Sequence, residues 1–290
     1  MIGAPPFVLG AVILALYAGG VRRYDRRHRT RPFSRARAAA FAGGVAVAAA
    51  SLGPPLDGWS SWLLSAHMVQ HLLLMLVAAP LLLIATPLRL ARQSGARPLE
   101  GAAAWLAHSP AVAAVTWPPA AWACFAAVLA GSHFSALYEA ALEYPAVHVL
   151  EHALYLAAAL VFWYPVVGLE PSRWRLGYGL RLLYLAAALP VQSFLGLAIF
   201  SSRHVLYPHY AVTAAVRNIS ALADQQAAGL IIWLGGGLPV ITALLLTAAA
   251  WAAEERRLAA HLDRVARSSL NNPISASVTP PAPTTTSHQP

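Results

Sequence analysis

The stretch AHMVQHLLLMLVAAPLLLIATPL, residues 66–88, carries no charged side chain and decides the fold class. About 20 apolar residues in a helix cross a bilayer core about 30 Å thick. The whole chain shares this character, since 58% of its 290 residues are hydrophobic, 11% are charged and the mean hydropathy is +0.57. A soluble domain carries about a quarter charged residues. The sequence therefore predicts an all-α, polytopic membrane helix bundle.

Similar apolar stretches along the chain give the predicted number of spans. We expect seven transmembrane helices, over about 4–21, 37–53, 66–88, 110–131, 146–167, 180–201 and 227–251. The transmembrane domain is expected to occupy residues 1–267. From residue 268 the chain is rich in Ser, Thr, Pro and Asn, which cannot bury enough apolar surface to fold. Residues 268–290 are therefore predicted to form a disordered cytoplasmic tail.

The basic residues predict which ends of the spans face the cytoplasm. All 20 are arginines, and all but Arg203 and Arg217 follow the first, third, fifth and seventh spans. Loops rich in arginine stay on the cytoplasmic side, so the N-terminus is predicted outside and the C-terminus inside. The formal net charge of +9 then reflects insertion into a lipid bilayer, and no nucleic-acid partner is expected.

Histidines gather at the predicted outer ends of the spans. His67 and His71 open the third span, His148 and His152 open the fifth, and His133 ends the fourth. Side chains four residues apart share a helix face, so each pair can reach one metal ion. Neutral imidazole suits copper, zinc and iron. With a single cysteine in the chain, a thiolate cluster is excluded, and these five histidines are the predicted metal ligands.

Several polar residues near the same ends are predicted to support this site. Glu151 lies inside a span, where an unpaired carboxylate is costly, and it can orient an imidazole, bind metal or stay protonated. Asp224 can cap the start of the seventh span or take part in the site. The remaining predicted supporting residues, all in outer loops, are Asp57, His209 and Gln225. Met68 is predicted to serve in packing.

Two other interpretations fit the same residues. The histidines can form a metal-free network of hydrogen bonds between helices, in a scaffold for other membrane subunits. Alternatively, His148-x-x-Glu151-His152 has the H-x-x-E-H spacing of a zinc hydrolase, in which the glutamate acts as the base. The spacing alone leaves both open.

The motifs together resemble those of a known family, the multi-span CtaG cytochrome c oxidase assembly factors of bacteria. The matching stretches are residues 67–88, residues 137–142, HVLEHALYLAAALVFWYPVVG at 148–168, LYPHY at 206–210 and DQQAAGLIIWLGGG at 224–237. The resemblance implies a multi-pass protein of the bacterial plasma membrane with cytochrome c oxidase subunits as partners. It departs at Ser132, where the family pattern has tryptophan beside the histidine, which puts the aromatic packing of His133 in doubt.

The resemblance also implies a role in assembly rather than turnover, so no enzymatic activity is expected. Combined with the outer histidines, it leads to the hypothesis that the protein supports formation of a copper centre. Copper is then the expected metal, although the residues alone allow zinc or iron.

Overall fold

The computed structural model describes residues 5–170 and 173–270, and within these ranges every regular element is a helix. In chain order they are α1 Pro5–Arg27, α2 Arg35–Ser51, α3 Leu56–Ser60, α4 Leu64–Leu72, η1 Leu73–Ala78, α5 Ala79–Ile84, α6 Pro87–Gln93, α7 Arg97–His108, α8 Pro110–Val115, α9 Pro118–His133, α10 Ala136–Glu143, α11 Pro145–Val167, α12 Tyr178–Ser201, α13 Pro208–Val216, α14 Ala221–Leu230, η2 Ile231–Gly235 and α15 Gly236–Leu270. The all-α prediction is confirmed.

Five helical segments of the described chain are long and apolar enough to cross a membrane. They are Pro5–Arg27, Leu64–Gln93, Pro145–Val167, Tyr178–Ser201 and Ala221–Ser268. A sixth span is possible if α9 and α10, which meet at a bend of 64°, count as one. α2 has only 17 residues and is not among them, so the prediction of seven spans is not confirmed.

The predicted span at 110–131 is broken near its start. α8 ends at Val115 and α9 begins at Pro118. The two prolines that follow Trp117 lack backbone N–H donors, and a residue before proline avoids the helical region. Trp117 accordingly has a ψ of 125°. Average hydropathy does not register this break.

Contacts divide the chain into two units, Met1–Leu245 and Leu246–Pro290. The described part of the second unit is the continuation of α15, which reaches Leu270. The boundary predicted at Ser268 falls in the last turn of this helix. Residues 271–290 lie outside the described residues, so the disordered tail stays a prediction.

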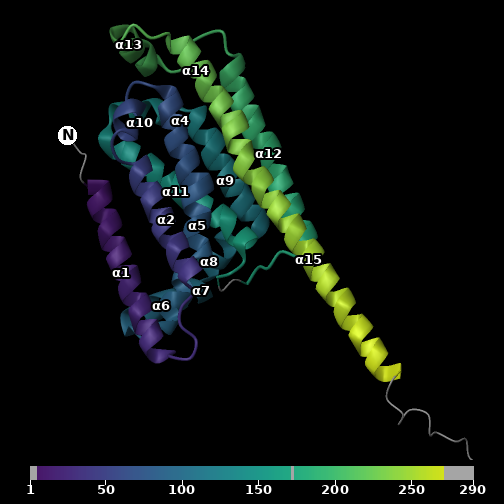
Figure 1. The fold of residues 1–290 in the computed structure, drawn as a ribbon. Coiled ribbons are helices and arrows are strands. Elements are labelled where there is room, and N and C mark those ends of the chain that lie inside the picture. The colour runs from purple at the N-terminus through teal and green to yellow at the C-terminus, as the bar shows by residue number, and fades with distance from the viewer. Residues whose placement is uncertain (1–4, 171–172, 271–290) are drawn as a thin grey trace, which may run out of the picture. The chain divides into compact units, whose positions relative to one another are not determined.

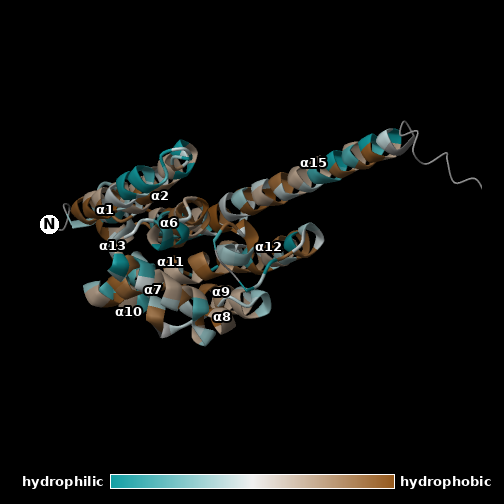
Figure 2. Cartoon of the chain, turned by 90° about the horizontal axis from the view of Figure 1, so that it is seen from below, coloured by the Kyte–Doolittle hydropathy of each residue, from teal (hydrophilic) through white to brown (hydrophobic). Residues whose placement is uncertain are grey.

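In the first unit, the arginine-rich loops and the predicted outer loops lie at opposite ends. Figure 1 shows α10, α13 and α14 at one end and α6 and α7 at the other. Arg27 Nη1 lies 3.6 Å from Glu100 Oε1, and Arg173 donates to the carbonyl of His108. Figure 2, viewed from this end, shows hydrophilic residues along α6. The structure thus groups the loops as their charge predicts.

Two wide turns of π-helix follow the histidine-bearing α4 and the polar α14. In η1, the Ala79 N–H bonds the carbonyl of Leu74, so the carbonyl of Met75 loses its usual partner. The Trp163 indole donates to that carbonyl at 2.9 Å. In η2, the Gln192 amide donates to the carbonyl of Ile232 at 3.2 Å. Side chains of α11 and α12 therefore bind backbone carbonyls within both wide turns.

Close backbone approach between α12 and α14 requires glycine. A Cβ added at Gly229 would lie 2.5 Å from the backbone nitrogen of Phe200 and 2.7 Å from the carbonyl oxygen of Gly196. Small residues allow membrane helices to pack this closely.

Replacing Gly229 with alanine is expected to destabilise the protein by about 1–3 kcal/mol, because the backbones of α12 and α14 must separate. Gly237→Ala is the matched control, since a Cβ there meets nothing within 4 Å. Thermal unfolding of both purified variants in detergent measures the difference. Equal melting temperatures for the two would contradict the close contact.

Candidate metal centre

α4 and α11 bring four of the predicted histidines into one cluster, buried except for the half-buried His148, which we call the histidine cluster: His67, His71, His148 and His152. The two rings on α4 have centroids 4.4 Å apart, and the two on α11 also 4.4 Å. Across the helices, the His67 ring lies 5.1 Å from that of His148 and 5.6 Å from that of His152. The i, i+4 spacing places each pair on one helix face.

Two sets of three residues could each hold a metal ion, because the potential ligand atoms within each set all lie within 4.8 Å of one another. One set is His67, His71 and His152, all buried, and the other is His67, His148 and Glu151. His67 belongs to both sets. Nitrogen and carboxylate oxygen atoms in such an arrangement suit a transition-metal ion.

Glu151 lies against the α4 histidines, with its side chain completely buried. Its Oε2 is 3.5 Å from Nε2 of His67 and 3.8 Å from Nε2 of His71. Neither carboxylate oxygen has a hydrogen-bond partner in the described chain, and the same holds for Nε2 of all four histidines in the cluster. Buried polar atoms are normally paired, and buried charges are paired or bind metals.

Hydrogen bonds on the far side of the rings fix two of the tautomers. Tyr210 donates to the carbonyl of Ser60 at 2.8 Å, and its hydroxyl lies 2.9 Å from Nδ1 of His67. Burial holds the pKa of Tyr210 well above its ordinary value, so the phenol keeps its proton. Nδ1 of His67 must then be the donor, which leaves Nε2 with a free lone pair. His152 likewise directs Nδ1 to the carbonyl of His148 at 3.1 Å. A second partner that fixes an imidazole in this way is typical of metal ligands.

His133 lies beside the cluster and outside both sets of ligand atoms. Its Nδ1 is 2.8 Å from the carbonyl of Leu129, and its Nε2 is 3.4 Å from Sδ of Met68. The ring centroid is 6.2 Å from that of His71. Met68, which was predicted to serve in packing, therefore also contacts the imidazole of His133 through its thioether sulfur.

Tyrosines from other elements supply aromatic packing around His133. The ring of Tyr138 stacks at 5.5 Å, and the hydroxyl of Tyr155 lies 3.0 Å from Nδ1. Ser132 contacts the same Tyr155 hydroxyl. Tyr207 donates to the carbonyl of His133, and burial raises the pKa of this tyrosine above its ordinary value. The departure from the family pattern at Ser132 thus leaves His133 in an aromatic environment.

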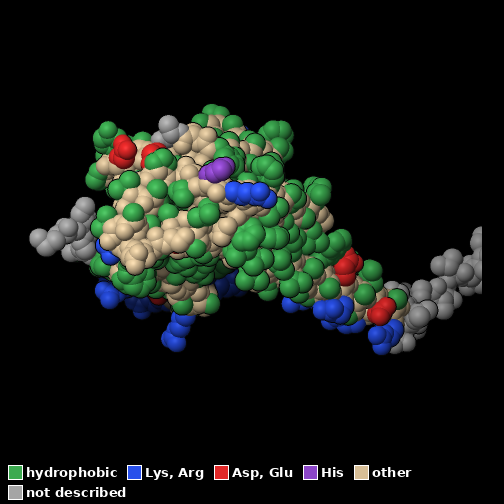
Figure 3. Space-filling model, turned by 90° about the horizontal axis from the view of Figure 1, so that it is seen from above, with side chains coloured by type: hydrophobic (Ala, Val, Ile, Leu, Met, Phe, Trp, Pro, Cys, Tyr) green, Lys and Arg blue, Asp and Glu red, His purple; other side chains and the backbone are tan. Residues whose placement is uncertain are grey.

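A cavity of about 640 Å³ reaches the histidine cluster from one side. His148 and His152 line it, and the predicted supporting residue Asp57 lies in its wall. His67 and His71 are on the cluster's buried side. A metal site needs an entry path, and this cavity offers one. Figure 3 views the molecule from this end and shows a mostly hydrophobic surface with few charged groups.

Two other predicted supporting residues make their contacts away from the rings. His209 directs Nε2 to the carbonyl of Ser61 at 3.1 Å. Gln225 binds the backbone of the 202–207 loop, accepting from Leu206 and donating to the carbonyl of His204. Both hold loops in place around the cluster.

Asp224 does not cap its own helix, where Ser220 accepts from the Ala223 N–H. Its carboxylate instead accepts from the Leu64 N–H at 2.6 Å and binds the Ser65 hydroxyl. These groups form the first turn of α4, whose neighbouring residue Leu63 has no capping side chain. Asp224 therefore caps the helix that carries His67 across a separation of 160 residues.

Asp224→Ala is expected to destabilise the protein by about 1–2 kcal/mol, the usual cost of a lost cap. Metal affinity is expected to fall as well, because the first turn of α4 frays next to His67. Asp224→Asn should retain part of the stability and part of the metal affinity, since an amide oxygen still accepts from an N–H. Thermal unfolding and metal titration of the two variants test this. Stability and affinity that remain at the parental level in Asp224→Ala would contradict it.

The tyrosines are the part of the site that the sequence analysis missed. Tyr210, Tyr138 and Tyr155 are among the largest fully buried side chains in the described chain. The hydroxyls of Tyr210 and Tyr155 lie beside His67 and His133, which are 143 and 22 residues away in sequence. The ring of Tyr138 stacks on His133. The spacing of the histidines gives no sign of these contacts. The available signal was their place in the matching stretches LYPHY, HVLEHALY and LYEAAL, the last of which is residues 137–142.

The chain matches one protein family and is similar to three mycobacterial proteins. A family model described as cytochrome c oxidase caa3 assembly factor matches residues 15–254. Uncharacterized proteins of Mycobacterium bovis and Mycobacterium tuberculosis are each 27% identical over 270 residues, covering 89% of this chain and 40% of the relative. A Mycobacterium leprae protein is 27% identical over 276 residues, with 92% and 41% covered. The chain thus spans about two fifths of the length of these relatives. No solved structure matches.

Proposed function

Since the chain belongs to the family of cytochrome c oxidase caa3 assembly factors, we propose that it supports the formation of active oxidase by holding copper in the histidine cluster. Oxidase subunits are its partners in this proposal. It acts by binding and handing over the metal, without turning over a substrate.

The observation that carries this proposal is the set of buried ligand atoms without partners. Nε2 of His67, His71, His148 and His152, together with both oxygens of Glu151, lack hydrogen-bond partners in the described chain. Leaving such atoms unpaired costs about 1–3 kcal/mol each. One metal ion satisfies several of them at once, while the opposite nitrogens of His67 and His152 are already hydrogen-bonded.

The donor set favours copper over metals that require other ligands. Imidazoles and one carboxylate suit copper, zinc or iron, whereas magnesium and calcium need oxygen ligands. Cys124 is a free cysteine on α9 and takes no part. Membership in an oxidase assembly family makes copper the metal of choice, because a haem–copper oxidase must acquire it.

We also propose that the histidine end faces outward in a bacterial plasma membrane and that the arginine end faces the cytoplasm. Cys124→Ser gives a cysteine-free chain, because Cys124 is the only cysteine. Single cysteines at Ser202 and at Gln93, which is exposed at the arginine end, should then report opposite sides. A membrane-impermeant maleimide applied to intact cells is expected to label the first and spare the second. The reverse pattern would overturn this orientation.

The functional experiment compares oxidase purified from strains with and without this protein. We expect the oxidase from the deletion strain to contain less copper and to regain it when the parental gene is restored. A chain with alanine at both His67 and His71 should be made and inserted in the membrane but fail to restore the copper. Full restoration by this variant would favour a metal-free scaffold instead.

A further inference from the structure

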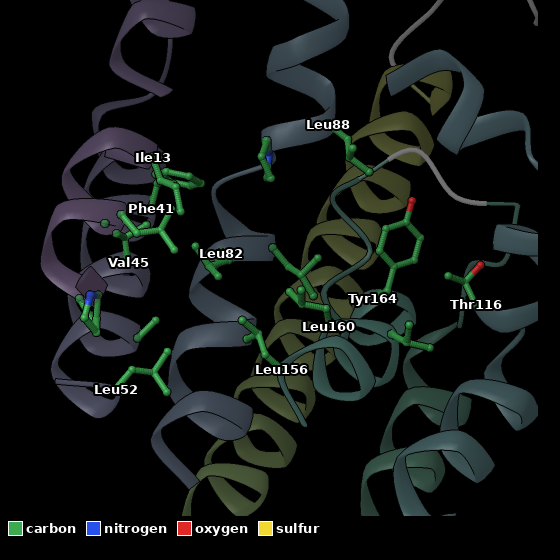
Figure 4. Close-up of a pocket in the computed structure, with 18 of the residues that line it drawn as sticks. Ile13, Phe41, Val45, Leu52, Leu82, Leu88, Thr116, Leu156, Leu160 and Tyr164 are labelled. Atoms are coloured by element: carbon green, nitrogen blue, oxygen red, sulfur yellow. The ribbon is translucent and has the colours of Figure 1, made fainter. Parts of the chain in front are cut away.

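A second cavity continues the one that reaches the histidine cluster. It measures about 500 Å³ and lies between α1, α2 and α11. Pro6, Leu9, Leu52 and Leu156 line both cavities, so the two adjoin. Figure 4 shows Leu156, Leu160 and Tyr164 on one side of the second cavity and Phe41, Val45 and Leu52 on the other. Together they form one groove.

The groove is long and changes character along its length. Its wall on α11 runs from His148 to Tyr164, which is about 24 Å at 1.5 Å per residue. Polar groups gather at the histidine end, whereas the far part is lined almost entirely by apolar side chains. A compact ligand does not match this shape. A molecule with a small polar head and a long apolar tail does.

The charge of the polar end excludes an anionic head. Asp57 is in its lining, and no arginine lines this cavity among the described residues. A phosphate would therefore meet a carboxylate without a compensating cation, which is unfavourable in a membrane. The head that fits is neutral.

The hydrogen-bonding groups at this end are mainly acceptors. Ser60 and Ser61 use their hydroxyl protons on the carbonyls of Asp57 and Gly58, at 2.9 and 2.8 Å. His152 already donates through Nδ1, which leaves Nε2 as an acceptor. The Asp57 side chain contributes further acceptor oxygens when ionised. A head that presents hydroxyl donors is matched to this set.

From these features we infer that the groove binds a membrane quinol, with its hydroxyl-bearing ring beside His148 and His152 and its isoprenoid tail along Leu52, Leu156 and Leu160. The combined cavity volume is ample for such a molecule, since ligand sites commonly measure about 300–1,000 Å³. The inference concerns the metal-free protein, because Nε2 of His152, which accepts from the quinol here, is a copper ligand in the proposed function.

The test uses the full chain in phosphatidylcholine nanodiscs with EDTA, kept anaerobic, and labelled decylubiquinol as the probe. Saturable binding is expected above that of empty nanodiscs. Decylubiquinone, which offers acceptors only, should bind at least fivefold more weakly, and decanol should not compete at equal concentration. Saturable binding despite excess phospholipid would support the quinol over a lipid acyl chain.

Two variants test whether decylubiquinol binds in the groove. Ala153 is exposed on α11 and lines the polar cavity, so Ala153→Phe is expected to weaken decylubiquinol binding at least tenfold. Ala186→Phe adds the same ring to an exposed position on α12, which contributes no residue to the groove, and should change binding less than twofold. The inference is overturned if binding does not saturate, if both variants bind like the parent, or if decanol and decylubiquinone compete as well as the quinol.

Discussion

Replacement of His67 by alanine is expected to weaken copper binding more than any other single histidine change. His67 belongs to both sets of potential ligand atoms, whereas His71 belongs to one. His71→Ala leaves the set of His67, His148 and Glu151 intact. Loss of a mere supporting hydrogen bond typically weakens metal affinity 10–100-fold. We therefore expect the affinity for copper to fall about 100-fold or more in His67→Ala and by a smaller factor in His71→Ala. The double variant, with alanine at both positions, should bind no stoichiometric copper.

Copper titration against a competing chelator, with elemental analysis of the purified protein, measures this order. His204→Ala is the matched control, because His204 is exposed in the loop between α12 and α13 and belongs to neither set of potential ligand atoms. His67→Gln addresses folding, since it fills the space of the imidazole better than alanine does. If the double variant bound copper as tightly as the parent, the histidine cluster would not be the copper site.

Sequence spacing was sufficient to predict the core of the candidate site. The two H-x-x-x-H pairs fall on single helix faces, and the order of the spans places both at the same end of the bundle. His67, His71, His148 and His152 therefore converge as expected. His133 lies next to them for the same reason, but its depth and rotation place Nε2 against Met68. Spacing carries no information on such details.

The spacing of residues along the sequence could not predict contacts between distant segments. Asp224 caps α4 from 160 residues away, and Tyr210 reaches His67 from 143 residues away. Local patterns allowed Asp224 either to cap its own helix or to take part in the site, and in the structure Ser220 caps that helix. The break at Trp117 was missed for a different reason, since hydropathy averages over prolines that interrupt the backbone. Tertiary packing determined the contacts of Asp224 and Tyr210, whereas local backbone chemistry determined the break at Trp117.

Glu151→Gln is expected to lower the affinity for copper while leaving the stability of the metal-free protein unchanged or raising it. Glutamine has nearly the same shape but no charge. Without metal, the buried carboxylate has no hydrogen-bond partner in the described chain, and a neutral amide of the same shape avoids the cost of burying an unpaired charge. The metal-free variant should therefore melt at the same temperature as the parent or higher. Copper affinity should fall about 10–100-fold, because the carboxylate no longer neutralises the ion or orients the imidazoles.

The same variant distinguishes the three interpretations of the histidines. A hydrolase of the H-x-x-E-H type would lose zinc-dependent turnover in Glu151→Gln, because the glutamate is its base. In a metal-free scaffold, Glu151 would instead stabilise protonated His67 and His71 at 3.5 and 3.8 Å. Glu151→Gln would then lower the melting temperature of the metal-free protein, since breaking a buried pair costs about 3–5 kcal/mol. A loss of stability without any change in copper affinity would therefore replace the metal centre with a buried ion pair.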